Sequence, residues 1–415
     1  MSLFLGVLFF VFNFSPYRSH NRRESGDFVD NIDNGFAMSP AIVEIHDFNK
    51  DMSDLRLKNS RMKAQNAVEA GNLSFDQLRS GKFPPFNIDG SDVIVFLHVQ
   101  KTAGTTFERY LVRQLEIPQP CQCRAGRKKC QCRRTDGRGF WLFSRFSTGW
   151  SCGLHADWTE LVQSGCVNEV LNRREHREDI KKKGWTSALE CVPAAVLLII
   201  PYRSANPARA RPAYRRYFLT TFLREPIARY LSEFRHMNRG ATWSASKHLC
   251  LDRYPTYEEL PPCFDPALGW TGVTFDDFVA CKSNLASNRQ TRMLADLSLV
   301  GCYNRTYFKS EVERGRKLLD SAKANLLKMA FFGLQEDMRR SQYVFERTFN
   351  LQFNKVLLNW NETTNLNDFT SRQVEIARRL NHLDLQLYQF AKHLFDQRFE
   401  ELKNDDPLFI LNIAS

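Results

Sequence analysis

The sequence predicts an α/β fold with a central parallel sheet that is flanked by helices. Two apolar runs, which begin at Val93 and at Tyr217, are rich in β-branched and aromatic residues. Such runs are typical of strands buried on both faces, as in parallel sheets. Each run leads into a short turn with a basic residue and then into apolar residues at helical spacing. With 415 residues, the chain has room for one large or two modest domains.

The N-terminus is almost wholly apolar from Leu3 to Phe14. This run is short for a transmembrane helix and resembles a signal-peptide core or a short signal anchor. Because no small-residue cleavage site follows, we expect an uncleaved anchor over residues 1–16 that attaches the chain to a membrane. The arginines follow the run instead of preceding it, against the usual orientation rule for a lumenal domain. A truncated N-terminus would explain that order.

Residues 17–90 are polar and read as a stem or linker, with one short helix expected from Gln65 to Leu78. Three glycosylation sequons begin at Asn72, Asn304 and Asn361. Together with an N-terminal hydrophobic segment, these sequons favour the secretory route.

The net charge of +12 indicates an anionic partner, which is a nucleic acid, an acidic lipid, or a sulfated or phosphorylated polymer. No nucleic-acid-binding motif is present, and the anchor and sequons also disfavour nucleic acid.

Eleven cysteines lie in the middle of the chain. Cys121 and Cys123 form a tight cluster with Cys130 and Cys132, for which a zinc site is the alternative to disulfides. Structural zinc usually takes Cys-x-x-Cys pairs, so the one-residue spacing favours disulfides in an oxidising lumen. An odd count leaves at least one thiol free or paired between chains.

This cysteine cluster also carries cations, among them Lys128 and Lys129. The cations belong either to a solvated loop or to a preorganised site for a polyanion. Aromatic residues follow in the stretch from Phe140 to Trp158, which contains Trp150 and His155. Aromatic side chains beside cations suit a core edge or a sugar-binding cleft.

The turn after the first strand has the features of an anion site. Backbone N–H groups at a helix N-terminus hold anions, Gly104 allows close approach, and Lys101 supplies a point charge. The lysine precedes the glycine, so this is not a Walker A loop. The alternative is a plain turn whose lysine is solvated.

At the second turn, Arg224 lies eight residues before Ser232, so both can reach one phosphate group. The alternative is that Arg224 pairs with a structural carboxylate.

The rest of the chain is expected to be mainly helical, with one further short strand from Met329 to Leu334. The expected helices are Phe275–Cys281, Asn284–Asp296, Glu311–Lys328, Asp337–Phe349 and Ser371–Phe399.

Several stretches resemble one family closely, the heparan-sulfate 6-O-sulfotransferases. The most specific are Trp141–Trp158 and Asn288–Tyr303, whose agreement is too long for chance. The other matching stretches are Val93–Phe107, Cys121–Cys132, Phe222–Trp243, Asn284–Asn304 and Ala330–Phe349.

The resemblance implies a sulfotransferase-type, P-loop-like fold and a catalytic domain over residues 91–403, with a tail at 404–415. It implies the sulfate donor 3′-phosphoadenylyl sulfate, no metal, and the 6-hydroxyl of glucosamine in heparan sulfate as acceptor. It also implies a single-pass type II Golgi membrane protein with a lumenal catalytic domain.

The resemblance also implies roles for individual residues at positions that match the family pattern. His155 would be the general base, with Lys101 stabilising the departing phosphate. Arg224 and Ser232 would hold the 3′-phosphate. The loop that would hold the 5′-phosphosulfate comprises His98, Val99, Gln100, Lys101, Thr102, Ala103, Gly104, Thr105, Thr106 and Phe107. A late loop with Leu358, Asn359, Trp360, Thr363 and Thr364 would close over the adenine. The polysaccharide would be bound by Lys128, Lys129, Arg145, Trp150, His155, His236 and Trp243.

The chain departs from the family pattern in three places. Ala103 replaces a usual glycine, Ala228 replaces a usual serine, and an insertion at about 180–213 does not align. The substitution at Ala103 leaves open an alternative class of function, a catalytically weak or inactive heparin-binding protein.

Overall fold

The computed structural model describes residues 68–135, 137, 139–148, 152–153, 155–175, 215–243, 246–264, 269–358 and 366–414. The expected anchor, residues 17–67 of the expected stem and the unaligned insertion lie outside the described residues.

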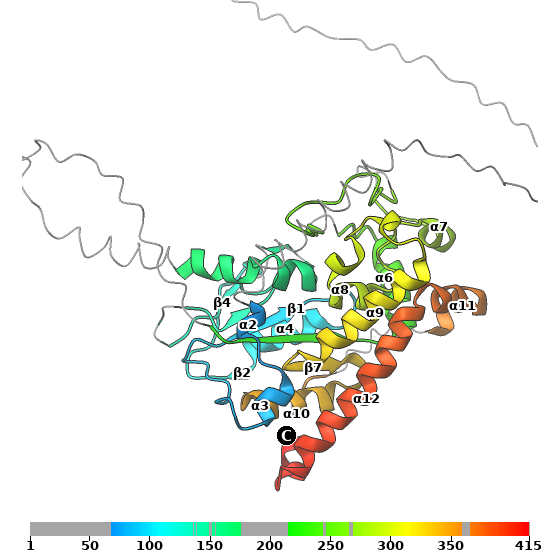
Figure 1. Cartoon of the computed structure of the whole chain (residues 1–415). Helices are drawn as coiled ribbons and strands as arrows, with labels where there is room; N and C mark the ends of the chain where they lie inside the picture. Colours follow the sequence, from blue (N-terminus) through cyan, green and yellow to red (C-terminus); the bar gives the residue numbers. More distant parts are fainter. Residues whose placement is uncertain are drawn as a thin grey trace, which may run out of the picture. The chain divides into compact units, whose positions relative to one another are not determined.

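The centre of the fold is a four-stranded sheet in the order β5-β1-β6-β7, and each neighbouring pair is parallel (Figure 1). These strands are β1 (Val93–Leu97), β5 (Leu142–Phe143), β6 (Tyr217–Leu223) and β7 (Phe331–Leu334). Every residue of the four strands is buried, as expected for a sheet covered on both faces. The predicted α/β class with a central parallel sheet is therefore confirmed.

A helix follows three of the strands, as the sequence pattern predicted for the first two. These helices are α4 (Gly104–Arg113), α6 (Pro226–Asn238) and α10 (Met338–Phe349), the last preceded by the turn η6 (Gln335–Asp337). Pro226 occupies the first turn of α6, and the Glu225 carboxylate caps it by accepting from the amides of Ile227 and Ala228.

Aromatic side chains join these helices to the sheet. The ring centroid of Phe107 in α4 lies 4.6 Å from that of Phe222 in β6 and 5.2 Å from that of Phe345 in α10. A Cβ at position 333 would lie 2.4 Å from the ring of Phe222, so glycine is required there for the strands to pack. Most of the buried side chains of the fold belong to this core.

Helices that follow in the C-terminal part of the chain are α9 (Glu311–Leu327), α11 (Ser371–Leu380), α12 (His382–Asn404) and α13 (Phe409–Ala414). The longest of them, α12, packs against β7 and α9 (Figure 1). The prediction of one helix over 371–399 was wrong, because the chain breaks at Asn381. The buried side chain of Asn381 accepts a hydrogen bond from the amide of Asn288, which fixes the break. In the expected tail, α13 contacts α10, and Phe409 packs at 5.3 Å on Tyr343.

Residues 68–90 pack on the sheet instead of forming a free linker. They contain α2 (Val68–Gly71) and α3 (Phe75–Arg79), where a single helix was expected. The two helices are separated at Asn72, which forms a parallel β-bridge with Tyr217 at the start of β6. Phe75 is fully buried, and a capping box of Ser74 and Gln77 begins α3. The folded part of the described chain therefore begins ahead of the expected boundary at residue 91.

The helix expected at 284–296 is also shorter than the pattern indicates. Only α8 (Arg289–Leu294) is α-helical there, and a 3-10 turn, η4 (Leu297–Val300), follows it. Asn288 has a left-handed φ of 46°, and its side chain accepts from the amides of Leu383 and Asp384 at the start of α12. This tertiary contact delays the helix. Further elements are α7 (Phe275–Ala280), η2 (Thr159–Gln163), η5 (Arg305–Tyr307), η7 (Leu366–Asp368) and helical residues at 166–175. Two short antiparallel pairs join β2 (Leu115–Glu116) to β8 (Gln352–Phe353) and β3 (Gln122–Cys123) to β4 (Cys130–Gln131).

Ten cysteines form disulfides, so the preference for disulfides over zinc is confirmed. The pairs are Cys121–Cys132, Cys123–Cys130, Cys152–Cys166, Cys250–Cys302 and Cys263–Cys281. The eleventh, Cys191, lies outside the described residues. Within the described part of the chain, no helix is long and apolar enough to span a membrane.

Candidate active site

The loop after β1 and the residue after β6 meet at one edge of the sheet. Parallel strands bring their carboxyl ends to the same edge, which is where ligands bind in open α/β sheets. There the Arg224 guanidinium donates from Nη1 to the carbonyl oxygen of Lys101 at 3.2 Å. The two basic turns that the sequence singled out are therefore in direct contact.

The loop between β1 and α4 has a strained backbone at two positions. Lys101 and Ala103 both have a φ of 67°, in the left-handed region that favours glycine. A Cβ on Gly104 would lie 3.0 Å from Nδ1 of His98, so glycine makes room for this ring. Gly104 and Thr105 form the first turn of α4, and their amides have no acceptor among the described residues. These free donors at a helix N-terminus are suited to hold an anion.

His98, Glu108 and Arg145 form a buried network behind this loop. Nδ1 of His98 lies 2.5 Å from Oε2 of Glu108, and Nε2 of His98 lies 3.3 Å from Nη1 of Arg145. A guanidinium only donates, so Nε2 of His98 accepts and Nδ1 donates to the carboxylate. The backbone amide of Arg145 donates to the other oxygen of Glu108 at 2.9 Å. Arg145 also donates to Oγ1 of Thr105 at 3.1 Å, so the network ties this arginine to the anion loop.

Burial and nearby charge set the protonation of this network. Burial raises the pKa of Glu108 to about 8, although the charge and the backbone amide of Arg145 oppose the rise. Burial, followed by the charge of Arg145, lowers the pKa of His98 well below its usual value. His98 is therefore a neutral ring that orients its neighbours.

His155 lies directly beside His98, with ring centroids 5.1 Å apart. Its Nδ1 is 3.4 Å from the carbonyl oxygen of His98, and its buried Nε2 has no partner among the described residues. Burial, the first cause, and the nearby basic groups His98, Arg145 and Arg289 hold the pKa of His155 well below 6.5. The carbonyl accepts the proton on Nδ1, which leaves the Nε2 lone pair free to accept another. This is the arrangement of a neutral general base.

Trp243 and His236 form the next wall of the site. Trp243 packs edge-on against His155, with a centroid distance of 4.9 Å, and His236 lies 5.1 Å from Trp243. Burial, followed by the charge of Lys101, lowers the pKa of His236. The lysine of the anion loop is therefore close enough to influence a histidine on this wall.

A buried ion-pair cluster holds Trp243 in place. The indole Nε1 donates to Glu233 at 2.9 Å, and the same carboxylate accepts from Arg289 and Arg229. Burial alone raises the pKa of Glu233, but the charges of Arg289 and Arg229 lower it to about 2. The carboxylate is ionised at neutral pH and fixes the indole from behind.

Arg224 is buried, and a reciprocal pair of hydrogen bonds with Gln290 fixes its backbone. The Arg224 amide donates to the Gln290 side chain, which donates back to the Arg224 carbonyl, both at 2.9 Å. The guanidinium Nε is buried with no partner among the described residues. Ser232 is also buried, on α6, which starts two residues after Arg224. Both lie on the β6–α6 unit, as the sequence predicted.

Lys128 and Lys129 are exposed on the hairpin of β3 and β4, which the two disulfides from Cys121 and Cys123 close. The amide of Cys130 donates to the carbonyl of Phe146 at 2.7 Å, and the Arg145 guanidinium lies 5.4 Å from the ring of Phe146. The hairpin is therefore attached next to Arg145.

Several predicted site residues are less informative. Trp150, Asn359, Trp360, Asn361, Thr363 and Thr364 lie outside the described residues. Leu358 is exposed. Of the sequons, the Asn304 side chain accepts from Thr306 at the exposed turn η5. The Asn72 side chain donates to the carbonyl of Lys328 at 2.8 Å.

Sequence reasoning missed Glu108, Glu233, Arg289 and Gln290. Glu108 and Glu233 lie in the helices after the two basic turns, and a charged residue within an otherwise core-facing pattern was an available signal. Gln290 offered no local signal, because its role depends on a contact with Arg224, 66 residues earlier.

Comparison with known proteins agrees with this geometry. A model of the sulfotransferase family matches residues 84–391. Heparan-sulfate 6-O-sulfotransferase 1 of Cricetulus griseus is 50% identical over 319 residues, which cover 76% of this chain and 70% of that protein. Heparan-sulfate 6-O-sulfotransferase 2 of Gallus gallus is 48% identical over 325 residues, 77% of this chain and 71% of that protein. Heparan-sulfate 6-O-sulfotransferase 3 of Mus musculus is 48% identical over 326 residues, which cover 78% of this chain and 61% of that protein.

Proposed function

The chain belongs to the sulfotransferase family, and on this premise we propose that it transfers the sulfo group of 3′-phosphoadenylyl sulfate to the 6-hydroxyl of glucosamine in heparan sulfate. The family match and the similarity to three heparan-sulfate 6-O-sulfotransferases make it a sulfotransferase and confirm the resemblance found in the sequence. The donor, the acceptor position and the roles of residues are parts of the proposal.

The observation that carries the proposal is the buried Nε2 of His155, whose lone pair has no partner among the described residues. A sugar hydroxyl is a poor nucleophile, and a positioned imidazole can take its proton as the oxygen attacks sulfur. The new bond joins the 6-oxygen to sulfur, and the bond from sulfur to the phosphate oxygen breaks. The proton ends on Nε2 of His155, and the electron pair leaves with adenosine 3′,5′-bisphosphate.

The anion loop supports the choice of donor. The free amides of Gly104 and Thr105, together with Lys101, would bind the 5′-phosphosulfate and stabilise the charge that develops on the departing phosphate. Arg224 and Ser232 would hold the 3′-phosphate, which suits the unpartnered Nε of a buried guanidinium. Residues 98–107 as a whole would form the donor loop, and the loop that begins at Leu358 would cover the adenine.

The acceptor would bind across the wall of His236 and Trp243 and reach the exposed Lys128 and Lys129. Arg145, held by the Glu108 network, would pair with a sulfo or carboxylate group of the polymer. Trp150 would complete this surface. We also propose that the enzyme acts in the Golgi lumen, anchored through residues 1–16 and glycosylated at its sequons.

The test is an assay of the full chain with the labelled donor and heparin that has lost its 6-O-sulfo groups, followed by disaccharide analysis. We expect label on the 6-position of glucosamine and nearly complete loss of transfer in Lys101→Ala. Label at another position would overturn the proposal. Tight heparin binding without transfer would favour the alternative, a catalytically inactive heparin-binding protein.

A further inference from the structure

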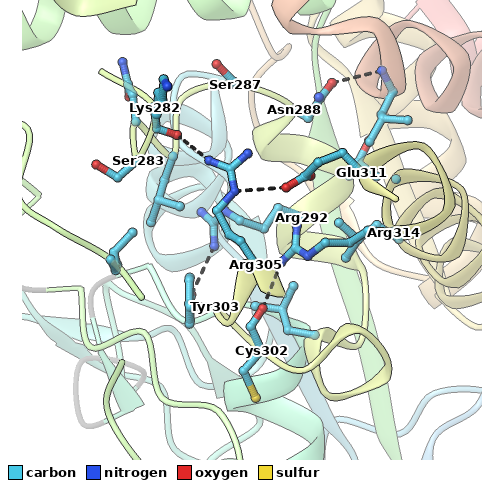
Figure 2. A pocket seen from close by; sticks show the side chains of 18 of the residues that line it. Lys282, Ser283, Ser287, Asn288, Arg292, Cys302, Tyr303, Arg305, Glu311 and Arg314 are labelled. Carbon is cyan, nitrogen blue, oxygen red and sulfur yellow. Dashed lines mark hydrogen bonds and ion pairs between the residues drawn. The ribbon is translucent and has the colours of Figure 1, made fainter. Parts of the chain in front are cut away.

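A cavity of about 320 Å³ lies apart from His155, between α8, α9 and the start of α12 (Figure 2). None of the residues to which the proposed function assigns a role lines this cavity. Its walls include the segment 282–288 and the turn that carries Tyr303 and Arg305. Its size is in the range of small-ligand sites.

Three arginines from different elements converge on this cavity, as Figure 2 shows. Arg305, at the start of η5, contacts the Glu311 carboxylate at 3.1 Å and donates to the carbonyl of Lys282 at 3.1 Å. Arg314 of α9 donates to the carbonyl of Cys302 at 2.9 Å. Arg292 of α8 reaches the Tyr303 hydroxyl only at 3.5 Å and the Asp157 carboxylate at 3.6 Å.

The positive charge in the cavity is not balanced by its own carboxylates. Glu259 also lines the cavity, but Arg253 engages both of its oxygens at 2.6 Å. Glu311 pairs with Arg305, and the only carboxylate within ion-pair distance of Arg292 among the described residues is that of Asp157 at 3.6 Å, which does not line the cavity. The Nε atoms of Arg292 and Arg314 are buried with no partner among the described residues. An oxoanion offers several acceptor oxygens to such a group of donors.

The lining of the cavity also contains apolar side chains. Leu297, Leu318 and Leu383 are buried side chains that contribute to it. A pocket lined by both cations and leucines fits a ring with an anionic substituent, such as a sulfated pyranose whose C–H face packs on leucine side chains. Two disulfides fix the cationic wall, because Cys302 is bonded to Cys250 and Cys281 to Cys263. Donors held in this way lose little freedom on binding.

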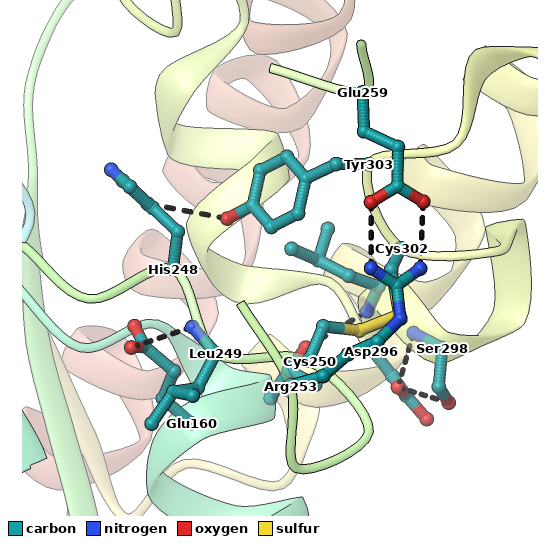
Figure 3. Close-up of a disulfide and its surroundings, with 12 residues drawn as sticks. Glu160, His248, Leu249, Cys250, Arg253, Glu259, Asp296, Ser298, Cys302 and Tyr303 are labelled. Carbon is teal, nitrogen blue, oxygen red and sulfur yellow. Dashed lines mark hydrogen bonds and ion pairs between the residues drawn. A yellow bond between two sulfur atoms is a disulfide. The ribbon is translucent and has the colours of Figure 1, made fainter. Parts of the chain in front are cut away.

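One segment of the chain connects this cavity to the candidate active site. The Tyr303 hydroxyl lies 3.3 Å from Nδ1 of His248, and Figure 3 shows this contact beside the Cys250–Cys302 disulfide. The neighbouring Lys247 packs on Gly153, because a Cβ added to Gly153 would lie 3.4 Å from Cγ of Lys247. Gly153 is two residues before His155. The segment 246–250 therefore runs between the cavity and the loop that carries the proposed base.

We propose that the cavity is a second binding site for the acceptor polymer, which takes one sulfated sugar of a chain whose other end lies at His155. The proposal rests on the proposed function for its choice of polymer. The recognised chemistry is a sulfo group, which free inorganic sulfate also carries. Only a sulfo group on a polymer makes binding depend on chain length, because a chain long enough to occupy both sites at once gains affinity from the second contact.

The test uses Arg305→Gln and Arg314→Gln, with Arg316→Gln as the matched control. Arg316 is an exposed arginine on α9 that does not line the cavity. Dissociation constants are measured for size-defined N-sulfated oligosaccharides, from tetrasaccharide to dodecasaccharide, and for inorganic sulfate. For the dodecasaccharide we expect each cavity variant to raise Kd by about five- to tenfold, the loss of a charge-assisted contact. The tetrasaccharide Kd should change less than about twofold, and Arg316→Gln should bind like the unmutated protein.

Equal changes for short and long oligosaccharides would overturn the proposal. So would cavity variants that no longer bind inorganic sulfate but keep the Kd of the dodecasaccharide, a result that would assign the site to free anions. Arg305 is half exposed, so its variant remains informative if Arg314→Gln fails to fold. The readout is binding and not transfer, so a failure of the proposed 6-O transfer would be seen separately in the labelled assay.

Discussion

Nδ1 of His155 lies 3.4 Å from the backbone carbonyl oxygen of His98, the first residue after β1. A carbonyl can only accept, so this contact places the imidazole proton on Nδ1 and the free lone pair on Nε2. The residue that opens the donor loop thus sets the tautomer of the proposed base. In the proposed mechanism, donor binding and proton transfer would therefore depend on one structural element.

Replacing the proposed base should affect turnover and not donor binding. His155→Ala is expected to lower kcat about a hundredfold or more, the usual size of a general-base contribution. The affinity for adenosine 3′,5′-bisphosphate, measured by calorimetry, should stay nearly constant. His393→Ala, a change at an exposed histidine of α12, serves as the control. Normal turnover, or a loss of donor binding alone, would remove His155 from the mechanism and leave His236 as the next candidate.

The pH profile of the unmutated enzyme should report the lowered pKa of His155. A general base acts only when it is neutral, above its pKa, and burial lowers this pKa well below 6.5. We therefore expect kcat/KM to stay level as pH falls to about 6.5 and to decline only at lower pH. A half-maximum at or above pH 6.5 would contradict the assignment.

The same measurement needs a check on folding. The buried rings of His98, His155 and His248 all have lowered pKa values, so the unfolded chain binds more protons below pH 6.5. These histidines therefore weaken the folded state as pH falls. Circular dichroism at each pH will separate loss of structure from loss of the base.

Arg224→Ala should weaken donor binding far more than acceptor binding. Its buried guanidinium has an unpartnered Nε and lies at the edge where the two strand-turn-helix units meet. The loss of a charged hydrogen bond to phosphate predicts a rise in Kd of about tenfold or more for adenosine 3′,5′-bisphosphate. Calorimetric titration measures it, with Arg316→Ala as the control. An unchanged Kd would show that Arg224 only supports the carbonyl of Lys101.

Ala103→Gly should stabilise the protein. Ala103 has a left-handed φ of 67°, which costs an alanine roughly 1–2 kcal/mol and a glycine very little. Part of this gain is offset by the greater freedom of glycine in the unfolded chain, so we expect an increase of about 0.5–1 kcal/mol in the free energy of unfolding. Denaturant titration measures this change. Ala377→Gly in α11 is the control and should destabilise by a similar amount.

Above pH 8, Glu108→Gln should destabilise the fold and weaken acceptor binding, because Glu108, whose pKa burial raises to about 8, is ionised there. Both carboxylate oxygens then accept hydrogen bonds, from His98 and from the amide of Arg145. A glutamine offers one N–H2 group in place of an acceptor, so one buried donor would face another at a cost of roughly 1–3 kcal/mol. Thermal unfolding and the KM for heparan sulfate measure the two effects. Glu375→Gln, on the exposed side of α11, should change neither. Wild-type stability in Glu108→Gln would show that the network is not needed.

Much of the fold followed from local patterns, because the buried strands and their helices are encoded by neighbouring residues. The strand from Tyr217 to Leu223 has the bounds that its apolar run predicted. The errors arose where a distant contact overrides the pattern. Asn288 and Asn381 bond to each other across 93 residues, and together they shorten one expected helix and divide another. No periodicity in either segment reports such a contact.

The candidate site likewise contains residues that local sequence predicts and residues whose role depends on distant contacts. The loop around Lys101 and the turn at Arg224 were predictable because strand, turn and helix are contiguous in the sequence. The side chains that hold these residues in place could not be predicted. Glu108 reaches Arg145 across 37 residues, and Gln290 reaches Arg224 across 66. A single sequence shows these side chains only as polar residues within helices.

The five disulfides all join residues between Cys121 and Cys302, and no cysteine lies in β1, β6, β7, α10 or α12. None of these strands and helices is therefore held by a disulfide of its own. Oxidation tightens the hairpin of Lys128, the loop before His155 and the cationic wall of the second cavity. Protein made in a reducing compartment should keep its sheet and secondary structure but present a loosened polysaccharide-facing surface. For this chain, the redox state of the compartment in which it matures would act as a control on substrate recognition more than on folding.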